Sequence, residues 1–406
     1  MSSSRPKVWK GFTLQNTFRL VCFCIVAKAS NTDHCTVNTS AQCSEGSIDE
    51  YSGTILDHNA TPVWDDSGYV MFCPCMGNFG NQAEYYIGSL AFAKSINRTL
   101  VLTPFRAKGS NIPFSEWFQI EPVRQFHRVI PIETFLEHFG ETEWAPGKRK
   151  GYCGRSTDTL YDCKMKSGNP LGPFWDDLNI SFDESVPYDT FDQADISNEK
   201  RTISLRNNWN KQFPSAEHPV LALRCAPASF PMAPGNRKIH QYLKWNPSLF
   251  SRAEDEIARM FHGEKYVGIH LRTGPDWVTS CSMTIGARTV MASPQCLTAG
   301  QPVFIEMCYP TVEHIVDLTT KAVIKYAVQH LFIATDRLSY SKELTEALTP
   351  LGVKVHHLDP QLPQMDLMIL GQSDFFIGNC ASSFTSFVKR ERDVSGKPST
   401  FWGFPV

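Results

Sequence analysis

Apolar residues along the chain define two regions in which short strands alternate with helices. In the first region, the apolar run Tyr69–Phe72 precedes a turn of small residues, 76–81, and apolar positions then recur at helical spacing from Gln82 to Ile96. A second apolar run, Thr99–Leu102, follows directly. A glycine-containing turn between a strand and a helix is typical of a βαβ unit.

The second region begins at the apolar run Tyr266–Leu271. Further strands are predicted at 331–334, 353–358 and 375–377, with helices at 312–329, 340–348, 366–371 and from Ser383 onward. Strands that alternate with helices indicate doubly wound, mostly parallel sheets. We therefore predict the α/β class, with two Rossmann-like domains that face each other across a cleft.

The chain divides into three parts on these patterns. Residues 30–68 are rich in Ser, Thr, Asn and Asp without sustained periodicity, so that 1–68 is expected to hold a signal peptide and a flexible stem. The N-terminal Rossmann-like domain is expected over 69–230. The C-terminal one follows over 231–406, with a last helix able to pack back on the first domain.

Composition narrows the class of protein. The 406 residues are 42% apolar and 20% charged, which is enough for a packed core. Lys and Arg (39) nearly cancel Asp and Glu (41), and the formal charge of −2 argues against a dedicated nucleic-acid binder or a polybasic membrane-surface protein. Thirteen cysteines are many for a cytosolic enzyme and favour the secretory pathway.

The N-terminal segment supports that compartment. Basic residues precede the apolar run Leu20–Ala27, and Ala27-Lys28-Ala29 offers a small-x-small cleavage step. A run of this length is far below the roughly 20 residues that span a bilayer, and no other stretch suffices, so we expect no stable membrane span. Four N-x-S/T sequons are candidate glycosylation sites: Asn38, Asn59, Asn97 and Asn179.

Residues that follow the predicted strands are the candidates for chemistry, because ligands of such sheets bind at the carboxyl ends of the strands. The turn Gly378–Ser383 leads into a helix and exposes backbone N–H groups, which suits a phosphate. Arg272 comes directly after the strand 266–271 and presents a planar fork that matches a diphosphate. Together these residues indicate a nucleotide diphosphate ligand.

Other nucleotide chemistries lack their motifs. The turn after the first strand is G-x-x-G-N without the acidic partner of a dinucleotide fold, and no P-loop sequence occurs. No D-x-D triplet is present, which removes the usual metal clamp of sugar-nucleotide enzymes and leaves Arg272 and helix N-termini to hold the diphosphate. On the residues alone, a position in the core explains His270 better than a ligand role does. Asp276 is explained equally well as a helix or turn cap and as a residue at the acceptor.

Six segments carry a family resemblance: Tyr69–Phe105, Gly168–Trp175 (GNPLGPFW), Glu217–Leu223 (EHPVLAL), Tyr266–Trp277 (YVGIHLRTGPDW), Met291–Cys296 (MASPQC) and Gly371–Gly396. They closely resemble the GDP-fucose protein O-fucosyltransferases, of the type that acts on EGF-like repeats. The resemblance runs in order over about 69–404 and implies a GT-B architecture, with GDP-fucose as donor in the cleft, inversion at the anomeric carbon and no metal cofactor. It implies folded EGF-like repeats of secreted or cell-surface proteins, such as Notch-type receptors, as acceptors, and the lumen of the endoplasmic reticulum as the compartment.

The resemblance also assigns roles to residues. The indispensable arginine of the family falls on Arg272, which pairs with the β-phosphate, and Asn81 orients the acceptor hydroxyl or the fucose. Asp366 recognises the guanine or a nearby polar edge. No carboxylate is an obvious general base, and Asp276 is the nearest candidate by its place in the sequence. The implied GDP-fucose contacts are Asn78, Phe79, Gly80, Asn81, His270, Leu271, Arg272, Asp366, Ser383 and Phe384.

The sequence departs from the family at two places, and eight of its cysteines match positions that are paired in the family. Asn78 stands where the family usually has arginine, and the chain ends Trp402-Gly403-Phe404-Pro405-Val406 without the KDEL-like retrieval signal. The missing charge supports one alternative, a weak or inactive member that binds EGF-like repeats as a chaperone-like module. A second alternative is an enzyme for thrombospondin-type repeats, against which the dense match to the EGF-repeat type argues. The implied disulfides are Cys73–Cys75, Cys153–Cys163, Cys281–Cys308 and Cys296–Cys380, with Cys225 left over.

Overall fold

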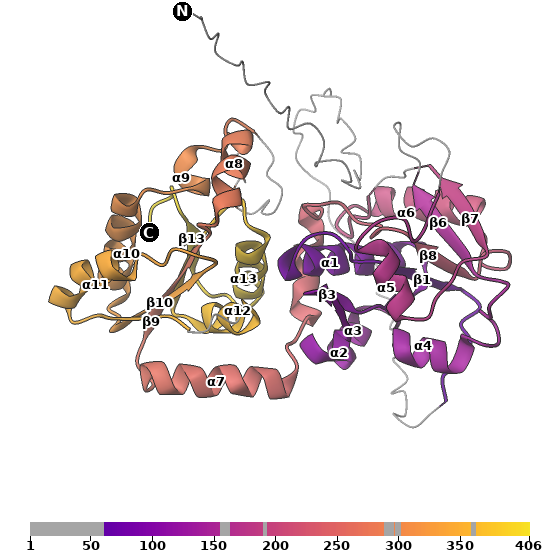
Figure 1. Cartoon of the computed structure of the whole chain (residues 1–406), viewed down its shortest axis with the longest axis horizontal. Helices are drawn as coiled ribbons and strands as arrows, with labels where there is room; N and C mark the ends of the chain where they lie inside the picture. Colours follow the sequence, from indigo (N-terminus) through magenta and orange to yellow (C-terminus); the bar gives the residue numbers. More distant parts are fainter. Residues whose placement is uncertain (1–60, 155–162, 190–192, 288–295, 297–301, 359–362) are drawn as a thin grey trace, which may run out of the picture.

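Two parallel sheets, one in each half of the chain, organise the protein (Figure 1). The computed structural model describes residues 61–154, 163–189, 193–287, 296, 302–358 and 363–406. The first sheet has the order β5-β2-β1-β8-β6-β7, and all its pairings are parallel. Its strands are β1 (Tyr69–Phe72), β2 (Thr99–Leu102), β5 (Val129–Pro131), β6 (Lys150–Gly154), β7 (Glu184–Tyr188) and β8 (Val220–Leu223).

The second sheet is also parallel throughout, in the order β11-β10-β9-β12-β13. A small antiparallel hairpin, β3 (Phe105–Ala107) with β4 (Ser110–Ile112), lies outside both sheets. The strands of the second sheet are β9 (Tyr266–Leu271), β10 (His330–Thr335), β11 (Lys354–His356), β12 (Phe375–Gly378) and β13 (Ser399–Phe401). The central strands of both sheets are buried on both faces, as parallel sheets covered by helices require.

Helices connect these strands. Those of the first half are α1 (Phe79–Ile96), α2 (Phe114–Trp117), α3 (Ile120–Phe126), α4 (Ile132–Phe139), α5 (Leu171–Asp177) and α6 (Glu199–Gln212). The 3-10 helix η1 (Pro234–Tyr242) and α7 (Pro247–Phe261) join the two sheets, and in Figure 1 α7 runs below the second half, with its N-terminal end toward the first half. The second half contains α8 (Pro275–Thr284), α9 (Ile305–Cys308), α10 (Val312–Tyr326), α11 (Ser341–Leu348), η2 (Thr349–Leu351), α12 (Pro363–Gln372) and α13 (Ser383–Val394).

The predicted alternation of strands and helices is confirmed, with shifted helix ends. Helix α1 begins at Phe79, three residues before the expected start, because Phe79 is the only apolar side chain in its first turn (FGNQ), and a single apolar residue gives no periodicity. Helix α10 ends at Tyr326 instead of 329, where Ala327 adopts a left-handed conformation (φ 49°) and its N–H caps the preceding carbonyls. No helix among the described residues has the length and apolarity that a bilayer crossing requires.

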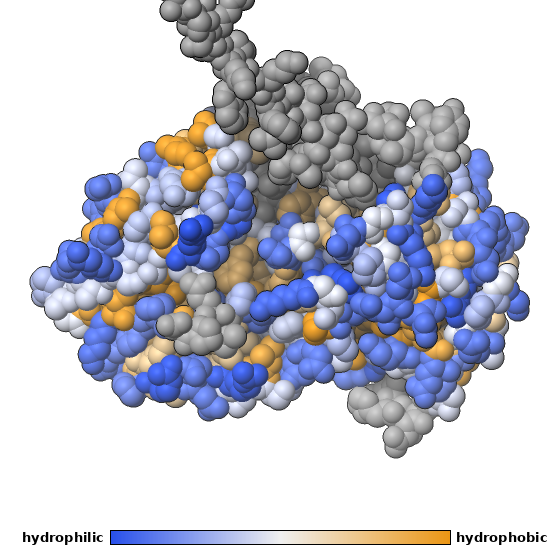
Figure 2. Space-filling model, in the orientation of Figure 1, coloured by the Kyte–Doolittle hydropathy of each residue, from blue (hydrophilic) through white to orange (hydrophobic). Residues whose placement is uncertain are grey.

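One hydrophobic core runs through both halves. It contains the inner face of α1, with Tyr86 and Leu90, and continues into α12 and α13 of the second half through Leu370 and Phe387. Helix α13 packs against α1 and η1 as well as α12, so the last helix of the chain lies on the first half. Figure 2 shows the surface hollowed between the two halves on the face where α1 and α13 meet.

Candidate active site

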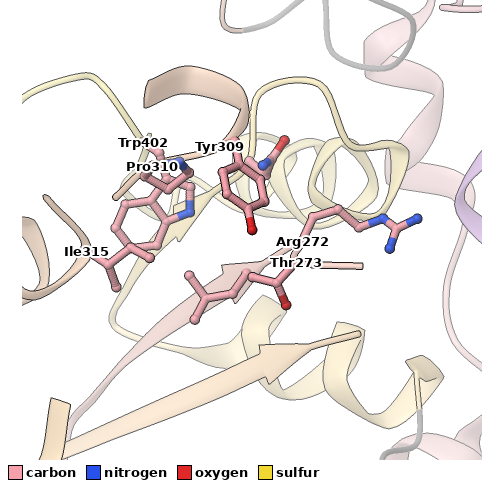
Figure 3. A pocket seen from close by; sticks show the side chains of 8 residues that line it. Arg272, Thr273, Tyr309, Pro310, Ile315 and Trp402 are labelled. Carbon is pink, nitrogen blue, oxygen red and sulfur yellow. The ribbon is translucent and has the colours of Figure 1, made fainter. Parts of the chain in front are cut away.

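Arg272 stands at the carboxyl end of the central strand of the second sheet, directly after β9. Its guanidinium is 23% exposed and forms two ion pairs, one from Nη2 to Asp276 Oδ2 at 2.6 Å and one from Nη1 to Asp336 Oδ2. The guanidinium carbon also lies 5.1 Å from the ring centre of Trp277. In Figure 3 the side chain extends away from Trp402 and Ile315, so the charged group lies outside the small cavity that these residues line.

Asp336 fixes the loop that carries Arg272. It follows β10, and its carboxylate accepts hydrogen bonds from the backbone N–H groups of Thr273 (2.7 Å) and Gly274 (3.1 and 3.2 Å). Gly274 makes this convergence sterically feasible, because a Cβ there would lie 2.5 Å from both Arg272 Nη1 and Asp336 Oδ2 and 2.7 Å from Asp276 Oδ1. Two carboxylates and one guanidinium therefore share a space that only glycine leaves open.

Both carboxylates hold Arg272, but not equally. The side chain of Asp276, in the first turn of α8, is 64% exposed, whereas that of Asp336 is 29% exposed and anchored by backbone N–H groups. Exposed ion pairs contribute at most about 1 kcal/mol. An arriving phosphate can therefore replace Asp276 on Arg272 at little cost, while Asp336 stays in place.

His270 is a neutral, buried neighbour of this group. Burial, followed by the positive charge of Arg272, lowers the pKa of His270 to about 3. Its Nδ1 lies 2.7 Å from Thr385 Oγ1, and its ring centre lies 4.5 Å from that of Phe384. The imidazole is therefore uncharged at neutral pH and is oriented by the first turns of α13.

The N-termini of α1 and α13 meet beside His270. Gly80 allows this contact, because a Cβ there would come within 2.8 Å of the Ser383 carbonyl carbon. Ser383 Oγ donates a hydrogen bond to Asn81 Oδ1 at 2.5 Å, across 302 residues of sequence. Each helix N-terminus carries a partial positive charge and free backbone N–H groups, so two such ends side by side suit a diphosphate.

Asp366 lies in the first turn of α12 and is almost fully buried. Burial raises the pKa of Asp366 to about 7, and Oδ1 has no hydrogen-bond partner among the described residues. A buried carboxylate oxygen without a donor is costly, and a ligand that brings N–H groups would satisfy it. No hydrogen bond between described side chains joins Asp366 to the Arg272 group.

The remaining expected contacts are placed as follows. Asn78 is the exposed N-cap of α1, and its side chain makes no capping hydrogen bond. Phe79 stacks among aromatic rings from both halves, such as Phe105 and Trp245. Leu271 is buried in the core of the second sheet, so its side chain serves packing. The described residues contain no group of three or more His, Cys, Asp or Glu side chains suited to a metal ion.

Sequence reasoning missed Asp336 as a site residue. The signal was present, because Thr335 and Asp336 directly follow a predicted strand whose neighbour in the sheet carries Arg272. What the sequence does not reveal is that β10 pairs with β9 in the register that sets Thr335 beside Leu271. That register brings Asp336 to Arg272.

All four expected disulfides are confirmed: Cys73–Cys75, Cys153–Cys163, Cys281–Cys308 and Cys296–Cys380. Cys225 takes part in none of them. The sequons Asn97 and Asn179 are exposed in left-handed positions at φ 60° and 57°. Asn38, Asn59 and the expected leader lie outside the described residues.

Comparison with known proteins gives one consistent result. The family model for GDP-fucose protein O-fucosyltransferase matches residues 69–395. GDP-fucose protein O-fucosyltransferase 1 of Caenorhabditis elegans is 36% identical over 357 residues, which is 84% of this chain and 91% of that protein.

Solved structures agree with the sequence comparison. The apo form of POFUT1 matches with a TM-score of 0.78 and 36% identity, and its complex with GDP-fucose with a TM-score of 0.78 and 35% identity. Each match covers 84% of this chain and 100% of the solved chain. The two Rossmann-like sheets form the GT-B architecture. The chain belongs to the GDP-fucose protein O-fucosyltransferase family.

Proposed function

We propose that this protein transfers fucose from GDP-fucose to a Ser or Thr hydroxyl of folded EGF-like repeats, with inversion and without a metal ion. The observation that carries the proposal is the position of Arg272, at the carboxyl end of β9. Next to it, the N-termini of α1 and α13 meet through Asn81 and Ser383. In a relative with 35% identity, the corresponding fold has been solved with GDP-fucose.

The donor site follows from these groups. The diphosphate lies against the two helix N-termini, and a phosphate oxygen takes the place of Asp276 on Arg272. Asp336 keeps the guanidinium aligned. Asp366 accepts N–H groups of the guanine base, which satisfies its unpartnered oxygen. Phe79 and Phe384 flank the phosphates, and Asn78 lies at the open end of α1.

The transfer is a displacement at the anomeric carbon. The bond from that carbon to the β-phosphate oxygen breaks, its electron pair stays on the phosphate, and the sugar acquires oxocarbenium character. Arg272 and the helix N-termini stabilise the charge that develops on the leaving diphosphate. The acceptor hydroxyl, oriented by Asn81, forms the new bond from the opposite face. Its proton passes to Asp276, which the phosphate has displaced from Arg272.

Metal independence is part of this proposal. Sugar-nucleotide enzymes with a metal clamp use the cation to neutralise the diphosphate. Here one guanidinium and two helix N-termini supply positive charge at the same place, and they act in a partly buried site where such charges are most effective.

The compartment and the domain boundaries belong to the same proposal. Four disulfides and two exposed sequons fit an oxidising compartment, and we place the protein in the lumen of the endoplasmic reticulum. We keep 69–230 and 231–406 as the two domains, with α13 as the element that the second returns to the first.

One assay tests the proposal. The full chain is incubated with GDP-fucose and either folded EGF-like repeats or folded thrombospondin-type repeats, with and without a chelator, and the repeats are weighed by mass spectrometry. We expect a gain of one deoxyhexose on the EGF-like repeats alone, unaffected by the chelator. A gain only on thrombospondin-type repeats, or loss of transfer with the chelator, would contradict the proposal.

A binding module is the second candidate, because Asn78 removes a charge that the family usually carries beside the donor. That function predicts retained binding of folded EGF-like repeats without mass gain on any repeat. Titration calorimetry with GDP-fucose distinguishes the two functions, because the transferase must bind the donor and the binding module does not need it.

A further inference from the structure

A polar ladder runs along the contact between α1 and α13, and it starts at the candidate donor site. On α1 its members are Asn81 and Glu84, and on α13 they are Ser383, Ser386 and Arg390. These residues are three or four positions apart, so each set lies on one face of its helix. The first rung is Ser383 to Asn81 (2.5 Å), the second is Ser386 Oγ to Glu84 Oε1 (2.8 Å), and the third is the ion pair of Arg390 with Glu84.

The third rung is completely buried. The side chains of Glu84 and Arg390 are both 0% exposed. The other oxygen of Glu84 accepts the backbone N–H of Met232 at 3.1 Å, and Arg390 Nε lies 3.4 Å from His240 Nδ1. Burial and the charge of Arg390 hold the pKa of His240 well below its usual range, so its ring is neutral and accepts from the guanidinium.

A buried ion pair of this kind contributes little to the stability of a protein. Removing two charges from water costs several kcal/mol per ion, and well-packed apolar residues of the same volume often stabilise a protein equally well or better. Directional hydrogen bonds do something that apolar contacts do not: they fix one register between two surfaces. The ladder fixes how far α13 is displaced along α1.

That register determines the geometry of the donor site. Gly80 and Ser383 touch through backbone atoms, so a shift of α13 along α1 moves one helix N-terminus relative to the other. The same shift moves Thr385 and Phe384, which orient His270 beside Arg272. We propose that the buried Glu84–Arg390 pair is a positioning element for the donor site, setting the two helix N-termini in the relative position that the diphosphate requires. The inference rests on the proposed function.

The test compares two buried arginines. Arg390→Lys keeps the charge but loses the fork that contacts Glu84, Ser386 and His240. Arg98→Lys is the matched control, because Arg98 is also buried and donates to the carbonyls of Phe213 and His218 at the amino ends of β2 and β8, the end of the first sheet opposite to the candidate site. At equal folded fraction, we expect kcat/KM for GDP-fucose to fall about 100-fold in Arg390→Lys, the scale of an ångström-sized misplacement. We expect it to stay near wild type in Arg98→Lys.

A double variant separates position from stability. Glu84→Leu/Arg390→Met removes both charges at similar volume, so we expect its melting temperature to exceed that of Arg390→Met alone while its kcat/KM stays low. Recovery of kcat/KM together with the melting temperature would overturn the inference, as would equal losses in Arg390→Lys and Arg98→Lys. If Arg390→Lys fails to fold, Ser386→Ala removes one rung and is measured in the same way.

The proposed function and this inference fail differently. Absence of transfer by the wild-type protein contradicts the proposed function. Normal wild-type transfer with an unchanged kcat/KM in Arg390→Lys contradicts the inference alone.

Discussion

The two halves of the protein contribute different groups to the candidate site. The first half contributes the N-terminus of α1, whose first turn carries no charged side chain, whereas the second half contributes Arg272, Asp276 and Asp336. The first half thus contributes backbone N–H groups, a helix dipole and the amide of Asn81. The second half contributes the charges and, through Asp366, a buried carboxyl group. Under the proposed function, this asymmetry predicts that the second half supplies most of the donor affinity and the first half the alignment of the reacting groups.

The largest effect is expected for Arg272→Lys. Lysine keeps the charge but cannot bridge Asp336 and a phosphate in one plane, so stabilisation of the leaving diphosphate is lost. We expect kcat to fall about 1,000-fold in the transfer assay. Arg128→Lys, at an ion pair with Asp65 far along the first sheet, serves as the control and should transfer fucose normally. Wild-type turnover in Arg272→Lys would contradict the central role of the second half.

Asp336→Asn is expected to have the next largest effect. Asparagine retains the shape and still accepts from the backbone of Thr273 and Gly274, but it no longer holds the guanidinium by charge. We expect GDP to bind about tenfold more weakly, which is the loss of one charge-assisted hydrogen bond. Isothermal titration calorimetry with GDP measures it.

The variant Asp276→Asn tests the second carboxylate that pairs with Arg272. Asp276 competes with phosphate for Arg272, so its neutralisation should leave GDP binding intact or tighter while transfer slows. Weaker GDP binding in Asp276→Asn than in Asp336→Asn would reverse the assignment of the two carboxylates.

The affinity for GDP should depend on pH through Asp366. Its pKa of about 7 means that the carboxyl group is mostly protonated at pH 6 and mostly ionised at pH 8. Because only the ionised form accepts two guanine N–H groups, we expect affinity to rise about tenfold from pH 6 to pH 8, with proton release on binding. Calorimetry in buffers of different ionisation enthalpy reports both. Asp366→Asn should flatten the profile, and a persistent slope would contradict the role of Asp366.

The same group affects stability with a definite sign. The folded pKa lies above the ordinary value of 3.8, so the folded state binds the proton more tightly and stability falls as pH rises from about 4 to about 7. Burial also raises the pKa of Glu391 to about 7. We therefore expect Asp366→Asn to remove about half of this slope in urea unfolding curves.

The smallest effect is expected for Asn78→Arg, which puts the charge usual in the family back on the first half. The position is exposed, so the added ion pair with the diphosphate is worth at most about 1 kcal/mol, or about fivefold in the KM for GDP-fucose. An increase of 100-fold or more would show that the first half can dominate donor binding.

Much of this arrangement was predictable from the sequence. Strands such as Tyr69–Phe72 are continuous apolar runs because both faces of a parallel sheet are buried, and this pattern can be recognised without knowing which strands are neighbours. The strands between β2 and β9 were harder to predict from the sequence. Strand β6 contains two glycines and β7 a proline, so neither has a strong β pattern, and both are held by pairing within the sheet.

The residues of the candidate site also divide into those that the sequence predicts and those that it does not. Arg272 and the turn before α13 follow strands directly and were predicted, as was Asn81. Asp336 and the Glu84–Arg390 pair were not, because they depend on register and helix packing across 62 to 306 residues. Charged residues on a helix normally indicate a solvated face, and only the packed structure shows that Arg390 is buried.

The contact between α1 and α13 has a consequence for synthesis of the protein. Ser383 and Arg390 are synthesised some 300 residues after Asn81 and Glu84. Helix α1 therefore lacks its contact with α13 until nearly the whole chain has been made. During that interval the face of α1 that α13 covers has no partner, although η1 and α6 already pack on the helix, and exposed apolar surface of this kind makes a partly synthesised chain prone to aggregation. Because α13 carries Ser383 and Thr385, the candidate donor site is complete only after this helix has been made.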